Sequence, residues 1–192
     1  MQTLEIVGAV IGLVYLYLEY KANRWLWLFG VIMPMVYVVI FYQSKFYADM
    51  GINIYYFLAS IWGWLVWTKK KHSAENGGRI SHTPARFILP LTLAGIAIFA
   101  LIVFILVNYT DSPVPYGDAF TTALSIVGMW MLAYKYIEQW GIWFVVNSVS
   151  CGLYFWKGLH YTGWLFAVYA VISIFGYLEW KRMMRQETGF SG

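Results

Sequence analysis

The chain has 192 residues, of which 61% are hydrophobic, 21% aromatic and only 11% charged. Soluble domains contain about 25% charged residues, so this composition excludes an ordinary soluble enzyme, a nucleic-acid-binding module and a disordered chain. The formal net charge of +4 is too small for a polyanion-binding surface, and the single cysteine, Cys151, excludes an internal disulfide framework. A chain of this kind places its apolar surface in a lipid bilayer.

Seven apolar segments have about the length of a membrane-spanning helix, which is about 20 residues. They cover residues 4–20, 25–42, 46–68, 87–108, 118–136, 140–157 and 161–180. Each segment is continuous and lacks the ten-residue alternation that is typical of membrane barrel strands. The sequence therefore predicts an all-α integral membrane protein with seven transmembrane helices.

The lysines and arginines are distributed unequally between the two sides of such a bundle. The segments on the side of the C-terminus hold 11 of the 13, and the opposite side holds only Lys45 and Lys157. Basic residues favour the cytoplasmic side. We therefore expect the N-terminus outside the cell, and the C-terminus and the basic loop 69–86 in the cytoplasm.

A weak internal repeat relates the first three segments to the last three at a spacing of about 113–115 residues. Residues 63–69 and 176–182 both contain Gly, an aromatic residue, Leu, Trp and a cation in the same order. Residues 20–25 match residues 134–140 with one residue of slippage, which pairs Trp25 with Trp140. Four crossings separate the two triplets, so they run in the same direction. The predicted organisation is a first triplet (1–68), a basic loop with a connecting fourth helix (69–117), a second triplet (118–182) and a cytoplasmic tail (183–192).

Polar and aromatic residues recur every three or four positions in four of the segments, so each set lies on one helix face. Polar groups are costly in lipid, and these faces are therefore expected to line a cavity inside the bundle. The residues assigned to substrate binding are Tyr15, Glu19, Asn53, Tyr56, Ser125, Trp140, Trp143 and Asn147. Two of them have alternatives: Trp140 suits an interface anchor equally well, and Glu19 can instead pair with a nearby basic residue.

A cavity with aromatic rings, carboxylates and amides suits a flat, cationic, hydrogen-bonding ligand. No lysine or arginine falls within the segments, which disfavours a phosphate group on that ligand. The three histidines, His72, His82 and His160, are scattered in loops, so we expect neither a metal site nor a cofactor.

The sixth segment resembles a signature of the PnuC family of vitamin transporters. Trp140 and Trp143 followed by Asn147 are similar to the Trp-x-x-Trp…Asn pattern of that family, and residues 118–140 are similar to its preceding span. The resemblance implies a 3+1+3 helix arrangement like that of a full-length SWEET protein, assembled as a homotrimer in the bacterial cytoplasmic (inner) membrane. It also implies facilitated diffusion of a vitamin, which phosphorylation in the cytoplasm then traps, and neither enzymatic activity nor a nucleic-acid partner.

The resemblance leaves the substrate open between two aromatic cations. Better-known members carry nicotinamide riboside, but Asn53 and Phe175 replace a Gln and an Asn that are common in those members. Residues 33–34 and 47–53 look like the thiamine-transporting branch. We therefore expect thiamine, with nicotinamide riboside as the alternative and a SWEET-like sugar as a remote third.

Overall fold

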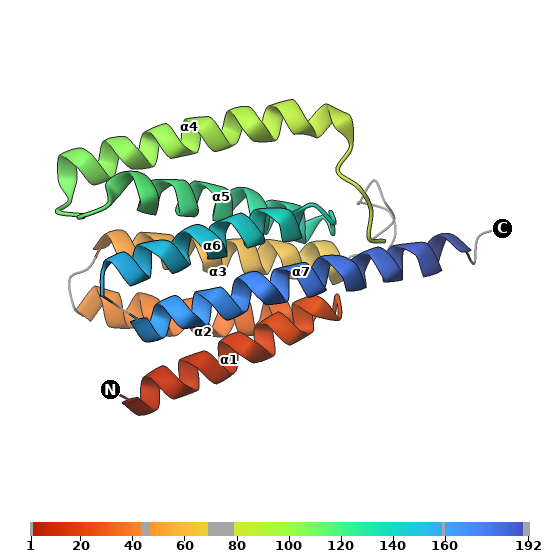
Figure 1. Ribbon diagram of the computed structural model, residues 1–192, viewed down its shortest axis with the longest axis horizontal. Coiled ribbons are helices and arrows are strands. Elements are labelled where there is room, and N and C mark those ends of the chain that lie inside the picture. Colours follow the sequence, from red (N-terminus) through yellow and green to blue (C-terminus); the bar gives the residue numbers. More distant parts are fainter. Residues whose placement is uncertain (1, 44–46, 69–78, 159, 190–192) are drawn as a thin grey trace. The chain divides into compact units, whose positions relative to one another are not determined.

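The computed structural model describes residues 2–43, 47–68, 79–158 and 160–189 and shows an all-helical chain (Figure 1). The helices of this part are α1 (Gln2–Tyr20), α2 (Leu26–Gln43), α3 (Tyr47–Thr68), α4 (Ala85–Tyr109), α5 (Pro115–Ala133), α6 (Gln139–Trp156) and α7 (His160–Gly189). Each of the seven predicted helices is confirmed as a helix. Lys45, His72 and the basic residues 69–71 lie outside the described residues.

Two helix ends differ from the prediction. The fifth segment was expected to continue to residue 136, but α5 ends at Ala133 because Lys135 has a left-handed backbone conformation. The seventh was expected to end at residue 180, but α7 continues to Gly189. The added residues include Lys, Arg, Met, Gln and Glu, which are good helix formers whether or not they contact lipid.

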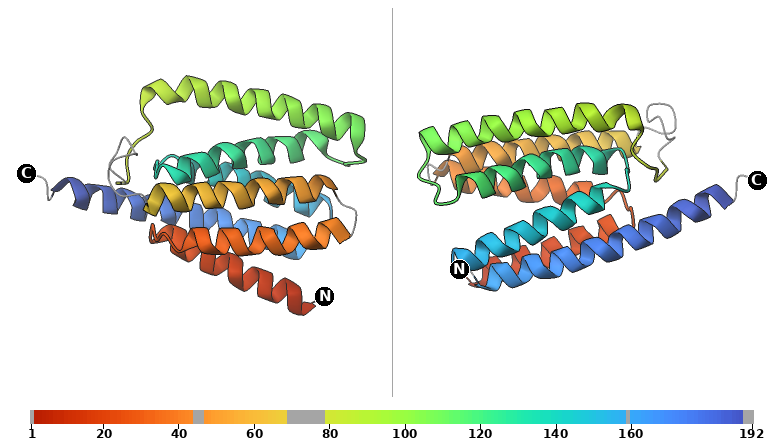
Figure 2. Two further views of the ribbon diagram at one scale, coloured as in Figure 1. Left: turned by 180° about the vertical axis from the view of Figure 1, so that it is seen from behind. Right: turned by 45° about the horizontal axis from the view of Figure 1, so that its top comes forward.

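The chain divides into two compact units, residues 1–79 and 80–192. In the first unit α2 contacts both α1 and α3 (Figure 1). In the second unit α6 contacts both α5 and α7, and α4 lies along α5 (Figure 2). The triplets α1–α3 and α5–α7 therefore share one contact pattern, in which the middle helix packs on both of the others.

The turns that follow α1 and α5 have the same backbone structure, with a constant spacing of 113 residues. Ala22 and Lys135 have φ angles of 47° and 56°. The amide N–H groups of Asn23 and Tyr136 donate six residues back, over 2.8 Å to Leu18 and 3.0 Å to Met131. The N–H groups of Ala22 and Lys135 donate to Glu19 over 2.9 Å and to Leu132 over 3.0 Å. Each helix thus ends in a Schellman motif, with alanine or lysine at the position that glycine usually occupies.

The two turns correct the repeat alignment that residue identity suggested. Matching letters paired Lys21 with Lys135 and Trp25 with Trp140, whereas matching backbone conformations pairs Ala22 with Lys135. The same spacing pairs Trp27, and not Trp25, with Trp140. Backbone conformation is the better guide here because the surface side chains of the turn are free to differ between the two copies.

An interlocking contact of two tryptophans and one glycine joins the second and third helices of each triplet. The ring pairs are Trp27–Trp67, with centroids 5.6 Å apart at 85°, and Trp140–Trp180, with centroids 5.8 Å apart at 87°. A Cβ atom on Gly63 would lie 2.4 Å from the Trp27 ring, and one on Gly176 would lie 2.5 Å from the Trp140 ring. Only glycine permits this approach, so each glycine is required by the tryptophan that faces it.

Ala22→Gly is expected to stabilise the protein, because glycine adopts a positive φ without the clash between Cβ and backbone. We expect a gain of about 0.5–1 kcal/mol in the free energy of unfolding, measured by thermal unfolding in detergent. The matched control is Ala133→Gly, in which the same change at a helical, 2% exposed position should destabilise by about 1 kcal/mol. Equal signs for the two variants would contradict the strained turn.

Two described stretches meet the length and hydropathy of a membrane span by themselves. They are Ala85–Tyr109, with a mean hydropathy of 2.8, and Thr162–Gln186, with a mean hydropathy of 1.4. The helix α4 has no buried residue, and its exposed side chains are mostly Leu, Ile, Val and Phe. Such a helix suits contact with lipid or with another protein chain.

Candidate functional site

The first unit brings three of the predicted site residues together. Tyr15 of α1 interacts electrostatically with Glu19, one turn later on the same helix, and with Tyr56 of α3. Glu19 is 2% exposed, and the Tyr15 ring lies 3.6 Å from where a Cβ atom on Gly30 would be. Asn53 is partly buried on α3, one turn before Tyr56. The first unit thus presents a cluster of hydroxyl, carboxylate and amide groups.

The second unit places Trp143 and Asn147 one turn apart on α6. The Trp143 ring packs on α5, 3.5 Å from where a Cβ atom on Gly128 would be, and its Nε1–H is buried without an acceptor among the described residues. Asn147 is 7% exposed, and its Nδ2 donates to the Ser173 hydroxyl of α7 over 3.3 Å. Ser125 lies on α5, where its hydroxyl donates to the carbonyl of Thr121 in its own helix over 2.8 Å.

Trp140 lies in different surroundings from Trp143, although only three residues separate them. It is 1% exposed and packs against Gly176 and Trp180 of α7. Its counterpart at the 113-residue spacing, Trp27, is 0% exposed and packs in the same way in the first unit. The structure thus places Trp140 in a helix-packing contact that both units repeat.

The 113-residue spacing also reveals an exchange of ring and glycine between the units. In the first unit Tyr15 of α1 faces Gly30 of α2. The equivalent positions in the second unit are Gly128 of α5 and Trp143 of α6, so here the ring comes from the second helix and the glycine from the first. Each triplet holds one aromatic ring at this place. The sequence contained this signal, but only in the correct repeat register.

An ion pair joins the start of α5 to the end of α6. Lys157 Nζ lies 3.1 Å from Asp118 Oδ1, and the Ser112 hydroxyl donates to Asp118 Oδ2 over 2.9 Å. Sequence reasoning placed Asp118 in the polar stripe of its helix and Lys157 in a loop, but it did not pair them. Their separation of 39 residues gave no local signal for the contact.

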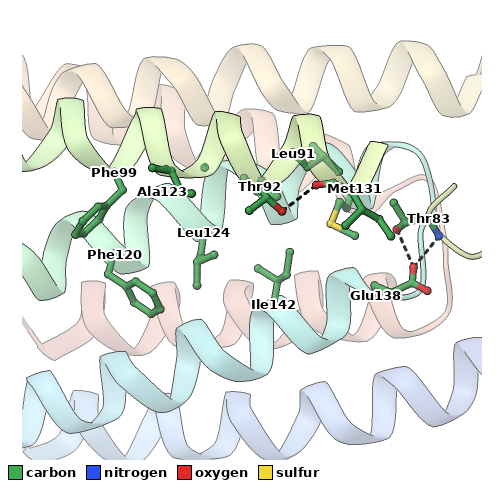
Figure 3. A pocket seen from close by; sticks show the side chains of 14 residues that line it. Thr83, Leu91, Thr92, Phe99, Phe120, Ala123, Leu124, Met131, Glu138 and Ile142 are labelled. Atoms are coloured by element: carbon green, nitrogen blue, oxygen red, sulfur yellow. Dashed lines mark hydrogen bonds between the residues drawn. The ribbon is translucent and has the colours of Figure 1, made fainter. Parts of the chain in front are cut away.

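At the opposite end of α5, the segment before α4 is fastened to the turn between α5 and α6. The Ser81 N–H donates to the Lys135 carbonyl over 3.2 Å, and the Ile137 N–H donates to the Ser81 carbonyl over 3.0 Å. Glu138 Oε2 accepts from the Thr83 N–H over 2.9 Å and from its hydroxyl over 2.8 Å (Figure 3). Glu138 Oε1 lies 2.7 Å from His82 Nδ1. His82, which the sequence left without a role, takes part in this contact.

The carboxyl group of Glu138 has a lowered pKa. Partial burial alone raises the pKa, but hydrogen bonds from His82 and Thr83 outweigh this effect and bring it below the ordinary value of 4.5. A carboxyl whose pKa is lower in the folded state stabilises the fold above its unfolded pKa. That contribution disappears as the pH falls through the folded value.

Glu138→Gln is therefore expected to lower the melting temperature near neutral pH, where the natural side chain is ionised. The difference from the unchanged protein should shrink as the pH falls below about 4.5, because the carboxyl then takes up a proton. Melting curves in detergent across this pH range measure it, with the exposed Asp111→Asn as the control. A difference that stays constant with pH would show that the carboxylate does not stabilise the turn through its charge.

A cavity of about 660 Å³ opens between α4, α5 and α6 of the second unit (Figure 3). Its lining is almost wholly apolar, with Phe99, Phe120 and Leu124 along it and Thr83 and Glu138 at one end (Figure 3). None of the predicted site residues lines this cavity. A hydrocarbon surface of this kind suits an acyl chain better than a polar vitamin, and we assign it no role in substrate binding.

Comparisons with known proteins agree with the sequence resemblance. Residues 2–182 match the model of the family described as "Nicotinamide mononucleotide transporter". The nicotinamide riboside transporter PnuC of Escherichia coli (strain K12) is 23% identical over 95% of this chain and 87% of its own length. The riboflavin/roseoflavin transporter RibM of Streptomyces davaonensis is also 23% identical, over 96% of this chain and 87% of its own.

A solved structure shares the fold. The crystal structure of the vitamin B3 transporter PnuC superposes with a TM-score of 0.70 at 25% identity, and covers 94% of this chain and 81% of that one. The family match spans both triplets and α4, and so includes every residue assigned to the candidate site. The chain therefore belongs to the nicotinamide mononucleotide transporter family, whose relatives described above are membrane transporters of vitamins.

Proposed function

We propose that this protein carries nicotinamide riboside into the cell. The observation that supports this substrate best is the pair on α6, where a partly buried indole ring and a buried amide lie one turn apart. The ring of Trp143 provides a stacking surface and Asn147 provides hydrogen bonds. Relatives named as nicotinamide riboside transporters match nearly the whole chain, which favours this alternative over the thiamine expected from sequence.

In our proposal Tyr15, Glu19, Asn53, Tyr56 and Ser125 complete the binding site. The clustering of Tyr15, Glu19 and Tyr56 within the first unit supports a role for that cluster. We assign Trp140 to helix packing instead of ligand contact, because Trp27 makes the same contact in the other triplet.

Seven membrane spans in a 3+1+3 arrangement with parallel repeats complete the proposal. The identical turns and tryptophan contacts of the two triplets support the repeat, and the cation bias supports a cytoplasmic C-terminus and an external N-terminus. The wholly unburied helix α4 offers a surface for a homotrimer within the cytoplasmic membrane. Carriage is passive, because we assign no acid–base pair at mid-span that would couple it to protons.

Thiamine is the second candidate, and two positions favour it. Asn53 is shorter than the Gln that the riboside carriers commonly have, and Phe175 replaces an Asn. Phe175 is 58% exposed, so this second difference lies on an outward-facing part of α7. That exposure weakens the argument for thiamine and leaves Asn53 as its main support.

A binding titration of the purified protein tests the proposal. We expect tight binding of nicotinamide riboside, weaker binding of thiamine, and much weaker binding of nicotinamide mononucleotide. The last expectation follows because the described helices hold Lys or Arg only near their ends, at Arg86, Lys181, Arg182 and Arg185, which leaves a phosphate unpaired at mid-span. Preference for thiamine over the riboside would replace the proposed substrate, and uptake into proteoliposomes only with an imposed ion gradient would overturn passive carriage.

A further inference from the structure

Asn147 and Ser173 form a buried hydrogen bond between α6 and α7. Asn147 Nδ2 donates to Ser173 Oγ over 3.3 Å, and the two residues are 7% and 2% exposed. The Ser173 hydroxyl in turn donates to the carbonyl oxygen of Tyr169 over 2.9 Å. The three groups form a chain of hydrogen bonds that runs in one direction, from amide to hydroxyl to carbonyl.

The direction of this chain determines which end of the Asn147 amide is available to a ligand. A serine hydroxyl has one hydrogen, and here it points to the Tyr169 carbonyl. Ser173 Oγ can therefore only accept from Asn147, which must turn its NH₂ group toward it. Oδ1 is left as an acceptor directed away from Ser173, and no donor among the described residues reaches it.

We propose that Ser173 is a positioning residue, which orients Asn147 so that Oδ1 accepts a hydrogen bond from an N–H group of the substrate. This inference rests on the proposed function, in which Trp143 and Asn147 contact one ligand. Because Trp143 lies one turn before Asn147, a ring stacked on Trp143 brings a substituent of that ring to the amide. A primary carboxamide or an aromatic amino group has the required N–H, whereas a carboxylate has none.

Two ligands that differ only in this donor test the inference. They are nicotinamide riboside and nicotinic acid riboside, in which a carboxylate replaces the carboxamide. We expect the unchanged protein to bind the carboxamide about tenfold or more tightly, because the carboxylate would place an acceptor against Oδ1. In Ser173→Ala the amide can turn its NH₂ to the ligand, so the preference should fall to about threefold or less.

Matched variants separate orientation from packing. Ser173→Thr keeps the hydroxyl and is expected to keep the preference. Ser148→Ala removes an exposed hydroxyl that donates only to its own helix, at the Phe144 carbonyl, and is expected to change neither affinity. If Ser173→Ala weakens both ligands by the same factor, Ser173 contributes only packing and the inference is wrong.

Two results from the unchanged protein need no variant to fold. Equal affinity for the two ribosides would overturn the orientation of Asn147 while leaving the proposed transport function in place. Binding of thiamine instead of either riboside would overturn the proposed substrate, and the inference would then be decided by thiamine against oxythiamine, whose amino group is replaced by oxygen. Preference for thiamine would support the positioned acceptor, and equal binding would refute it.

Discussion

Trp140→Ala is expected to lower the free energy of unfolding by about 3 kcal/mol, the lower end of the range for removing a tryptophan from a protein core. The ring is 1% exposed and fills the space between α6 and α7 that Gly176 leaves open. Within a bilayer the loss comes from packing contacts, since lipid tails are as apolar as the side chains they would replace. Thermal unfolding in detergent measures the effect.

Two variants of tryptophan serve as controls for Trp140→Ala. Trp27→Ala removes the equivalent ring of the first triplet and should cost a similar amount. Trp164→Ala removes a ring that is 66% exposed and should cost little. If Trp140→Ala melts like the unchanged protein but no longer binds the riboside, its ring contacts substrate, and our assignment to packing is wrong.

Removal of the ring or the amide on α6 should weaken substrate binding by about tenfold or more. A stacking or cation–π contact in a dry site contributes about 1–2 kcal/mol, and leaving a buried hydrogen-bonding partner alone costs about 1–3 kcal/mol. A difference of about 1.4 kcal/mol is a factor of ten in affinity. We therefore expect this loss for Trp143→Ala and for Asn147→Leu, measured by titration with nicotinamide riboside.

The control for these two variants is Trp25→Ala. Trp25 lies in the turn before α2, is 47% exposed, and packs edge-on against Trp64 with the ring centroids 5.7 Å apart. Its removal should leave the affinity nearly unchanged. If Trp143→Ala and Asn147→Leu both fold and bind as the unchanged protein does, that face of α6 points away from the substrate.

The helices were predictable because long apolar runs determine them almost without reference to tertiary contacts. The end of α5 was not, since it depends on a left-handed backbone conformation at Lys135, and lysine is not a residue that signals such a turn. The extension of α7 to Gly189 was missed for a different reason. Hydropathy detects where a helix leaves the membrane, but it does not detect where the helix ends.

The candidate site was predictable to the level of helix faces but not of individual contacts. Three-and-four spacing placed Trp140, Trp143 and Asn147 on one stripe, yet the first packs on α7 and the second on α5. Periodicity cannot make that distinction, because both rings belong to the same residue type. Ser173 was missed although it stands 113 residues after Ser60, and only the correct repeat register brings that pairing out.

The exchange of ring and glycine between the triplets has a consequence for how the two halves diverged after duplication. Positions such as Trp27 and Trp140 do the same work in both copies, so a saturation mutagenesis experiment should find that they tolerate the same substitutions. Tyr15 and Gly128 stand at equivalent positions but differ in size and polarity, and their tolerance profiles should be unrelated. Comparing each residue with its partner 113 positions away would thus separate the inherited scaffold from the surface that adapted to an asymmetric ligand.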